Sequence, residues 1–444
     1  MMLHDPINKV IPKLAVPTII SMLITSIYNM ADTYFVSQLG TSASGAVGIL
    51  FSAMSFIQAL SFTIGMGSGT NVSQALGAGD EEKAKQYVAT GFFTAFAVGI
   101  VIAILAVVYI DPLVRFLGAT DTIFPYARDY ATYIFYATPF IMCSFVMNNL
   151  LRFEGMTLYG MIGIGFGGVL NIVLDPVFIF AFDMGTAGAA IATAISQVIS
   201  FFILLYMTNT RSDAIAIHPG NFRFRANIYG RILYNGVPSL GRQGIASVSS
   251  IILNHIAGGY GDAAIAALSI VNRFAMFINS SVVGFGQGFQ PVCGFCFGAR
   301  RYTRVRQAFW YSVKVTTVIL IVLSILVFPF AESIVTLFRR DDPEVIRIGT
   351  LALRVQVFTM PLWGLIVMGN MFTQSIGYGI RSTILSSARQ GWCLIPVLFI
   401  ASFLAGLFGI QIAQPVSDAL TFVISVIIIA GIMKQLKSLP EENL

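Results

Sequence analysis

Long apolar runs separated by short polar segments are the dominant pattern along this chain. A membrane-spanning helix needs about 20 mostly apolar residues, and twelve runs are long enough to meet this requirement. They lie near 10–37, 47–75, 87–110, 124–150, 160–181, 187–207, 232–257, 265–296, 308–330, 345–374, 383–405 and 410–433. The pattern predicts an all-α polytopic membrane protein with twelve transmembrane helices.

A polar stretch at 209–231 divides this series of runs in the middle. It predicts an N-terminal lobe at 1–208 with helices 1–6 and a C-terminal lobe at 232–444 with helices 7–12. The stretch between them is expected to be a cytoplasmic linker.

The two lobes are internal repeats. A shift of 221 positions places Pro17 on Pro238, and one more position places Pro139 on Pro361. Because six spans return the chain to its starting side, we expect parallel lobes related by an axis along the membrane normal. Each of the two later prolines removes a backbone hydrogen bond inside a helix, which allows either a packing kink or a hinge.

Composition supports a membrane protein, since 56% of the residues are hydrophobic, 10% are charged and the mean hydropathy is +0.81. Soluble domains carry about 25% charged residues. The net charge of +6 does not indicate nucleic-acid binding, because the basic residues lie in short loops. The first apolar run begins near Val10 and lacks a cleavage-site pattern, so we expect no signal peptide.

Two motifs that resemble chemical sites are better explained by packing. Cys293 and Cys296 form a C-x-x-C pair at the end of an apolar run, where a redox or metal role is disfavoured. The cluster Gly163-Ile-Gly-Phe-Gly-Gly168 also lies in an apolar run, which favours close helix contact over a nucleotide loop. We therefore expect no cofactor.

The distribution of basic residues predicts the orientation in the membrane. Seventeen lysine and arginine residues lie on the side of the N-terminus, and five lie on the other side. This bias places both termini in the cytoplasm.

Acidic and polar residues inside the spans of the first half are the candidate functional group. Asp32 lies near the outer end of span 1, Asn171 and Asp175 lie one turn apart in span 5, and Thr193 lies in span 6. Counting residues places Asp32, Asp175 and Thr193 at one depth, roughly 7–10 Å below the outer end. Carboxylates in hydrocarbon are costly, so a functional role is the default interpretation.

Two carboxylates that share a dry pocket cannot both stay ionised cheaply. A proton or a monovalent cation would relieve the repulsion, which predicts a site for H⁺ or Na⁺ at Asp32, Asn171, Asp175 and Thr193. A freed backbone carbonyl, that of Ala189, is a further candidate ligand.

The second half lacks this set of residues, since the repeat places Leu253 opposite Asp32. Its own ionisable residues within the spans are Arg242, Arg273, Arg354 and Asp418. We expect a structural ion-pair network among the last three, with a role in substrate binding or coupling as the alternative.

The chain resembles the multidrug and toxic compound extrusion (MATE) family. The resemblance rests on the spacing Pro17…Asp32, on the motif Asn171-x-x-x-Asp175-Pro176 and on Thr193. It also rests on the loop Leu76-Gly-Ala-Gly-Asp80, echoed as Phe297-Gly-Ala-Arg-Arg301, and on the two six-span halves. The similarity covers essentially the whole chain and points to the branch of bacterial exporters with the cation site in the N-terminal lobe.

This resemblance implies a V-shaped pair of lobes that exports organic, often cationic, drugs and dyes in exchange for H⁺ or Na⁺. It implies a monomer in the lipids of the bacterial plasma (inner) membrane, with no nucleic-acid partner and no enzymatic activity. In that branch the residues matching Asp32, Asn171, Asp175 and Thr193 take part in coupling. From our own inspection, the candidates for a substrate cavity are Tyr28, Met54, Gln58, Asn148, Met276 and Asn279.

Other classes fit the sequence less well. A lipid-linked precursor flippase of the same superfamily is the main alternative, but few basic residues lie in the first-half spans. A major-facilitator transporter would carry a basic loop after span 2, where this chain has Gly77-Ala-Gly-Asp-Glu-Glu-Lys83. A membrane enzyme would need a catalytic constellation, and a channel a repeated ring of charge, and we find neither in the sequence.

Overall fold

The computed structural model describes residues 2–211, 214–338 and 342–441, and these residues form helices and loops without a β-strand. In the described ranges, ten helices are long and apolar enough to cross a membrane, judged by length and composition. The last of them, Gly379–Ser438, contains 60 residues and is divided at Gly406, whose φ of 57° and ψ of −132° are not helical. It therefore holds two spans, and the 33-residue helix α8 supplies the twelfth. The predicted fold class is confirmed.

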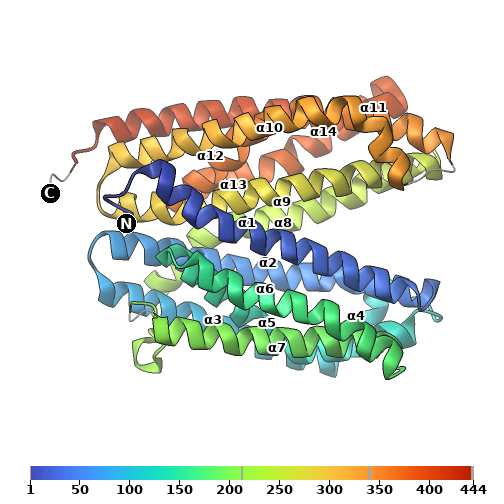
Figure 1. Cartoon of the computed structure of the whole chain (residues 1–444), viewed down its shortest axis with the longest axis horizontal. Coiled ribbons are helices and arrows are strands. Elements are labelled where there is room, and N and C mark those ends of the chain that lie inside the picture. The colour runs from blue at the N-terminus through green and yellow to red at the C-terminus, as the bar shows by residue number, and fades with distance from the viewer. Residues whose placement is uncertain (1, 212–213, 339–341, 442–444) are drawn as a thin grey trace. The chain divides into compact units, whose positions relative to one another are not determined.

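The helices of the first half, shown in Figure 1, are α1 (Ile7–Ser37), α2 (Thr41–Gly77), α3 (Glu81–Val108), α4 (Ile110–Phe116), α5 (Phe124–Glu154), α6 (Thr157–Pro176) and α7 (Gly185–Arg211). Those of the second half are α8 (Ala226–Gly258), α9 (Asp262–Gly298), α10 (Tyr302–Phe338), α11 (Pro343–Thr359), α12 (Trp363–Ser375), α13 (Gly379–Ser387) and α14 (Leu394–Ser438). The short helix α4 was not predicted, and α8 begins at Ala226 rather than at 232.

Short irregular turns interrupt several spans. A π-helical turn, Val177–Ala181, follows Pro176, and another, Ala388–Trp392, joins α13 to α14. Pro361 lies in a 3-10 turn between α11 and α12, whereas its repeat partner Pro139 stays inside an unbroken α5. The same proline position is therefore a break in one half and a continuous helix in the other.

Contacts within the chain define two compact units. We call Lys13–Gly236 the first-half unit, and Met1–Pro12 together with Val237–Leu444 the second-half unit. The predicted linker at 209–231 groups with the first-half unit, and its residues 212–213 lie outside the described residues. The division into lobes at 208 and 232 stays a prediction.

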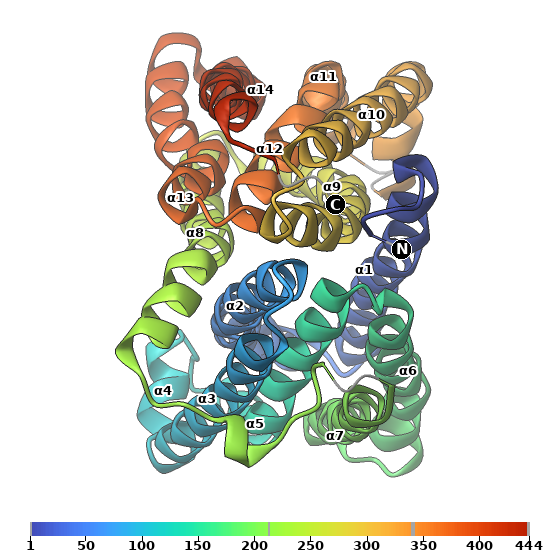
Figure 2. The same cartoon turned by 90° about the vertical axis from the view of Figure 1, so that its left-hand side faces the viewer.

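Helix α5 lies at the centre of the first-half unit, where it packs against α2, α3 and α7 (Figure 2). Its side chains Ile134, Met142, Met147 and Leu150 are buried in the main apolar core. Burial of large apolar side chains among the helices fixes α5 in place, so that its polar residues have defined neighbours.

The second-half unit has its own core around Trp363, Phe309 and Phe372, which are almost fully buried. Both cysteines of the C-x-x-C pair, Cys293 and Cys296, are buried free thiols on α9. Their burial is consistent with a role in helix packing.

Glycines allow α2 and α8 to cross with their backbones in contact. An added Cβ at Gly67 would lie 2.0 Å from the carbonyl oxygen of Ile232, and one at Gly236 would lie 2.0 Å from that of Thr63. No side chain fits at this distance, so these two positions require glycine.

We expect Gly67→Ala to lower the free energy of unfolding by about 1–3 kcal/mol, because the methyl group forces the two helices apart. Gly48→Ala is the matched control on the same helix, since an added Cβ there meets no atom within 4 Å. Thermal unfolding in detergent measures both variants. Equal unfolding temperatures would show that the α2–α8 crossing does not depend on Gly67.

Candidate functional site

Glycines of α6 bring the helices of the candidate site together. A Cβ at Gly168 would lie 3.1 Å from Cδ1 of Tyr28 on α1, and one at Gly163 would lie 2.3 Å from Cδ2 of Leu204 on α7. The glycine cluster is therefore a packing surface for both neighbours of α6. A site shared by spans 1, 5 and 6 requires these helices to be neighbours, and α6 indeed contacts both α1 and α7.

Asn171 is the centre of the hydrogen bonds in this site. Its Nδ2 donates to Oδ1 of Asp175 over 3.2 Å and to Oγ1 of Thr193 over 3.1 Å. The three residues are buried, and Asp175 has no exposed surface. The structure thus brings together three of the predicted cation ligands.

Asp32 joins the group from α1 and is 9% exposed. Its Oδ2 accepts a hydrogen bond of 3.4 Å from the hydroxyl of Tyr130 on α5. Asp32 and Asp175 lie within electrostatic range of each other, and Tyr130 lies within range of both.

Tyr130 was missed by our inspection of the sequence. The available signal was its depth, because it lies about 9 Å from the first residue of α5 at 1.5 Å per residue. That is the level of Asp32 and Asp175. A buried hydroxyl at the depth of two acids is a candidate partner for either of them.

Several buried oxygens of this site have no hydrogen-bond partner. They are Oδ1 of Asp32, Oδ2 of Asp175 and Oδ1 of Asn171, together with Oγ of Ser196, which lies one turn after Thr193 on α7. Buried polar atoms are nearly always hydrogen-bonded in native proteins, so a group of orphans requires an explanation. A hard cation, or a proton on a carboxylate, would satisfy them.

The site contains no basic partner for its acids. Among the described residues no lysine or arginine forms an ion pair with Asp32 or Asp175. Nor do three or more His, Cys, Asp or Glu side chains gather in those ranges as a metal-binding group. The arrangement has two carboxylates and neutral oxygens, which suits a monovalent ion rather than a divalent one.

The carbonyl of Ala189 is not freed in this structure, because α7 runs without interruption from Gly185 through Thr193. An α-helical carbonyl accepts the N–H four residues later. A different carbonyl next to the site loses its donor, that of Ile172, because Pro176 lies four residues after it and has no N–H. The better candidate for a backbone ligand is thus Ile172.

The predicted cavity residues have varied surroundings. Tyr28 lies within electrostatic range of Asp32, and the Sδ of Met54 lies 4.0 Å from the Tyr130 hydroxyl. Gln58 and Asn148 are half-buried in the first-half unit, and Met276 is exposed in the second-half unit. Tyr28 and Met54 thus join the acidic site, whereas Gln58, Asn148 and Met276 stay cavity predictions.

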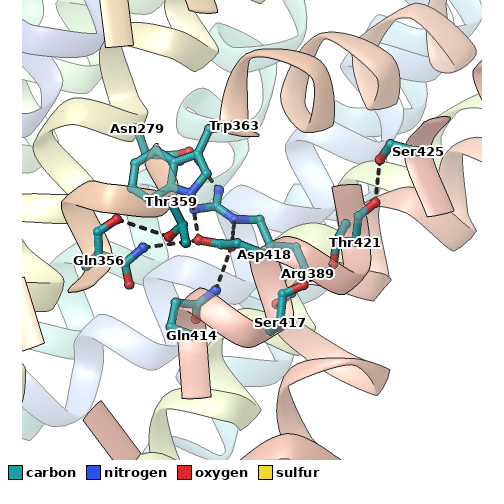
Figure 3. Close-up of polar contacts among 10 residues, drawn as sticks. All are labelled: Asn279, Gln356, Thr359, Trp363, Arg389, Gln414, Ser417, Asp418, Thr421 and Ser425. Carbon is teal, nitrogen blue, oxygen red and sulfur yellow. Dashed lines mark hydrogen bonds and ion pairs between the residues drawn. The ribbon is translucent and has the colours of Figure 1, made fainter. Parts of the chain in front are cut away.

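Asn279, the last of the six predicted cavity residues, has a polar partner within the second-half unit. Its Oδ1 accepts a hydrogen bond of 3.1 Å from a terminal nitrogen of Arg389 (Figure 3). The Nε of the same arginine lies 2.8 Å from Oδ1 of Asp418, and its guanidinium lies 4.2 Å above the ring of Trp363.

The carboxylate of Asp418 has a full set of donors. Besides Arg389, the side chains of Gln356 and Gln414 donate over 3.1 Å, and Nε1 of Trp363 donates over 2.7 Å (Figure 3). This aspartate is as buried as Asp175, yet both of its oxygens are paired. We call these residues and Asn279 the Arg389 cluster.

The predicted network of Arg273, Arg354 and Asp418 is therefore wrong in its partners. Asp418 pairs with Arg389, and Arg273 is exposed on α9. Arg389 is one of the seventeen basic residues counted from the sequence on the side of the N-terminus, but it lies in the π-helical turn Ala388–Trp392 and pairs with Asp418 inside the unit. Arg242 makes a long contact of 3.5 Å with Asn370.

Three further basic residues bear on the predicted orientation. Arg152 is another of the seventeen basic residues counted on the side of the N-terminus, but it is 2% exposed at the end of α5 and donates to Asn149. Arg339 and Arg340, on the opposite side, lie outside the described residues.

Comparison with known proteins shows which family this chain resembles over almost its whole length. The sequence profile of the family described as MatE matches residues 17–177 and 238–400, one match in each half. The multidrug export protein MepA of Staphylococcus aureus (strain MSSA476) is 28% identical over 428 residues, covering 96% of this chain and 94% of that protein. MepA of Staphylococcus saprophyticus is 27% identical and covers 94% of this chain and 92% of its own length.

Solved structures show the same fold. An outward-facing multidrug resistance MATE family transporter of the MOP superfamily superposes with a TM-score of 0.93 at 27% identity, covering 99% of this chain and 98% of its own. A MOP superfamily transporter from Pyrococcus furiosus superposes with a TM-score of 0.92 at 27% identity and the same coverage. The matched profile covers well over half of the residues. The chain therefore belongs to the MatE family and is a multi-pass membrane transporter rather than an enzyme.

Proposed function

We propose that this transporter exports organic, often cationic, drugs and dyes in exchange for H⁺ or Na⁺. The exchange of an ion is supported by the buried oxygens of Asp32, Asn171 and Asp175 that have no hydrogen-bond partner. The substrate class is supported by the relatives, which are named multidrug export proteins.

The coupling ion binds where the two carboxylates repel each other. Entry of a proton or Na⁺ removes that repulsion and satisfies oxygens that have no donor otherwise, so the ion stabilises one conformation of the site over another. Alternating access follows if the ion-loaded state favours the arrangement of the lobes that has already released its substrate.

The driving force depends on the exchange ratio. One charge that moves down about 100 mV gains about 2.3 kcal/mol, which corresponds to roughly a fortyfold substrate gradient. If one monovalent cation leaves for each ion that enters, the charges cancel and the chemical gradient alone drives export.

Ethidium efflux from proteoliposomes with imposed gradients tests this proposal. Efflux driven by a sodium gradient at constant pH would identify Na⁺ exchange, and efflux driven only by a pH gradient would identify H⁺ exchange. Liposomes without protein and vesicles with collapsed gradients are the controls. Folded protein that drives no efflux under either gradient would contradict the proposal.

We further propose that the protein is a monomer in the bacterial plasma membrane with both termini in the cytoplasm. The bias of basic residues that supports this orientation remains when the buried Arg152 and Arg389, which pairs with Asp418, are left out. The flippase alternative is not favoured, because the matched curated relatives named above are multidrug export proteins.

A further inference from the structure

An open cavity of the second-half unit lies apart from the Arg389 cluster, between α10 and α11. It has a volume of about 550 Å³. Glu332 of α10 and six residues of α11 line it. The latter are Pro343, Ile346, Arg347, Thr350, Leu351 and Arg354. None of them belongs to the proposed cation site or to the six candidates for the substrate cavity.

Two polar groups in this cavity have no hydrogen-bond partner among the residues that the structure describes. The Nε of Arg354 is buried without a hydrogen bond, and its guanidinium lies 5.8 Å from the ring centre of Phe328. The Oγ1 of Thr350, a residue that is 8% exposed, is likewise buried and unpaired. Thr350 and Arg354 are one helical turn apart, so both donors lie on the same face of α11 and next to the same part of the cavity.

The two donors lie near the boundary between the hydrocarbon core and the headgroups of a bilayer. The span Pro343–Ser375 has 33 residues, about 50 Å of helix, whereas the hydrocarbon core is about 30 Å thick. If the excess is shared between the ends, Arg347 lies among the headgroups and Arg354 lies roughly 6 Å inside the hydrocarbon. A long arginine side chain at that depth extends toward the interface and needs an anionic partner there.

The surface around the cavity is apolar. Leu351 lines it, and exposed side chains on the same two helices are Phe328, Leu337 and Phe358. In a membrane protein such side chains face acyl chains. A ligand of this cavity is therefore expected to have a polar headgroup joined to a hydrophobic body.

The cavity also contains a carboxylate. Glu332 is exposed on α10, and neither it nor Arg354 forms an ion pair with any described residue. Arg347 is already paired with Glu344 over 3.2 Å. Opposite charges that share a cavity without contacting each other suit a ligand that carries both signs.

We propose that this cavity binds a phospholipid whose headgroup carries a phosphodiester and a primary ammonium group, as in phosphatidylethanolamine. The phosphate accepts hydrogen bonds from Arg354 and Thr350, the ammonium group pairs with Glu332, and the acyl chains lie along α10 and α11. A free phosphate ion would use only the first pair of donors and none of the apolar surface.

Native mass spectrometry of the full-length, delipidated protein in detergent tests the assignment. Dioleoyl phosphatidylethanolamine, phosphatidylglycerol and inorganic phosphate are titrated separately. We expect phosphatidylethanolamine to bind most tightly, and Arg354→Gln to weaken it at least about tenfold, because a charge-assisted hydrogen bond is lost. Glu332→Gln should reduce its affinity to that of phosphatidylglycerol.

Arg273→Gln is the matched control, since Arg273 is an exposed arginine of the same unit that does not line the cavity. If Arg354→Gln does not fold, Thr350→Val and Glu332→Gln carry the test. Unchanged affinity in the cavity variants would overturn the site. Displacement of the lipid by inorganic phosphate at similar concentrations would show a phosphate site and overturn the lipid assignment.

Discussion

Replacing Asp32 with Asn is expected to reduce ion-driven dye efflux to the background of protein-free liposomes. The asparagine keeps the shape of the side chain but cannot carry the charge that binds a proton or Na⁺. Asp175→Asn is expected to have the same effect, because the two carboxylates form one site with Asn171. Efflux in proteoliposomes under an imposed sodium or pH gradient measures both variants.

The folded state should survive these replacements. Asp32 and Asp175 are buried without a basic partner among the described residues. Neutralising such a carboxylate removes a desolvation penalty, so the unfolding temperature of either variant should equal or exceed that of the wild type. Loss of efflux together with a lowered unfolding temperature would instead indicate a structural role.

Asp111→Asn is the matched control for efflux. Asp111 lies in the same unit, but it is half-exposed and pairs with Arg128 over 2.9 Å. Removing an exposed ion pair costs little, and efflux should stay normal. Driven efflux at wild-type rates in Asp32→Asn would show that this carboxylate does not couple the ion.

Replacing Asp418 with Ala is expected to lower the stability of the protein strongly, whereas Asp32→Asn and Asp175→Asn are expected to leave it unchanged or higher. The change leaves the guanidinium of Arg389 without its counter-ion and the donors of Gln356, Trp363 and Gln414 without an acceptor. Removing one partner of a buried ion pair costs about 3–5 kcal/mol. The unfolding temperature in detergent should fall accordingly, even with the acidic site of the first half intact.

Asp121→Ala is the control for this variant, because Asp121 forms a comparable pair of 3.0 Å with Arg115 on the exposed surface. We expect a change within about 0.5 kcal/mol there. Arg389→Ala alone and in combination with Asp418→Ala completes a double-mutant cycle. Additive losses would mean that the two side chains do not stabilise each other.

Together these variants distinguish two buried aspartates that look alike in the sequence. Asp175 has an oxygen without a donor, whereas both oxygens of Asp418 are occupied. To bind at Asp418, an ion would have to displace Arg389 and the neutral donors. At Asp175, it could bind the oxygen that accepts no hydrogen bond. We therefore expect ion-dependent behaviour from the first-half acids alone.

The sequence alone predicted the spans, the repeat and a common depth for the residues of the proposed cation site. Apolar length is a local property, and the helical rise converts residue number into depth, so counting residues is enough to place Asp32, Asp175 and Thr193 at one level. Asn171 and Asp175 are one turn apart on one helix, and their contact of 3.2 Å follows from that spacing.

Only the tertiary structure decided which side chains meet across helices. The rotation of a helix about its axis depends on packing, and a single irregular turn changes it. The π-helical turn Ala388–Trp392 turns Arg389 onto Asp418, which the residue spacing had paired with Arg273 and Arg354. Tyr130 and Asp32 are 98 positions apart in the sequence, and only the packing of α5 against α1 brings their side chains together. The depth of a side chain follows from its position along its own helix, whereas the direction in which it points depends on how the neighbouring helices pack.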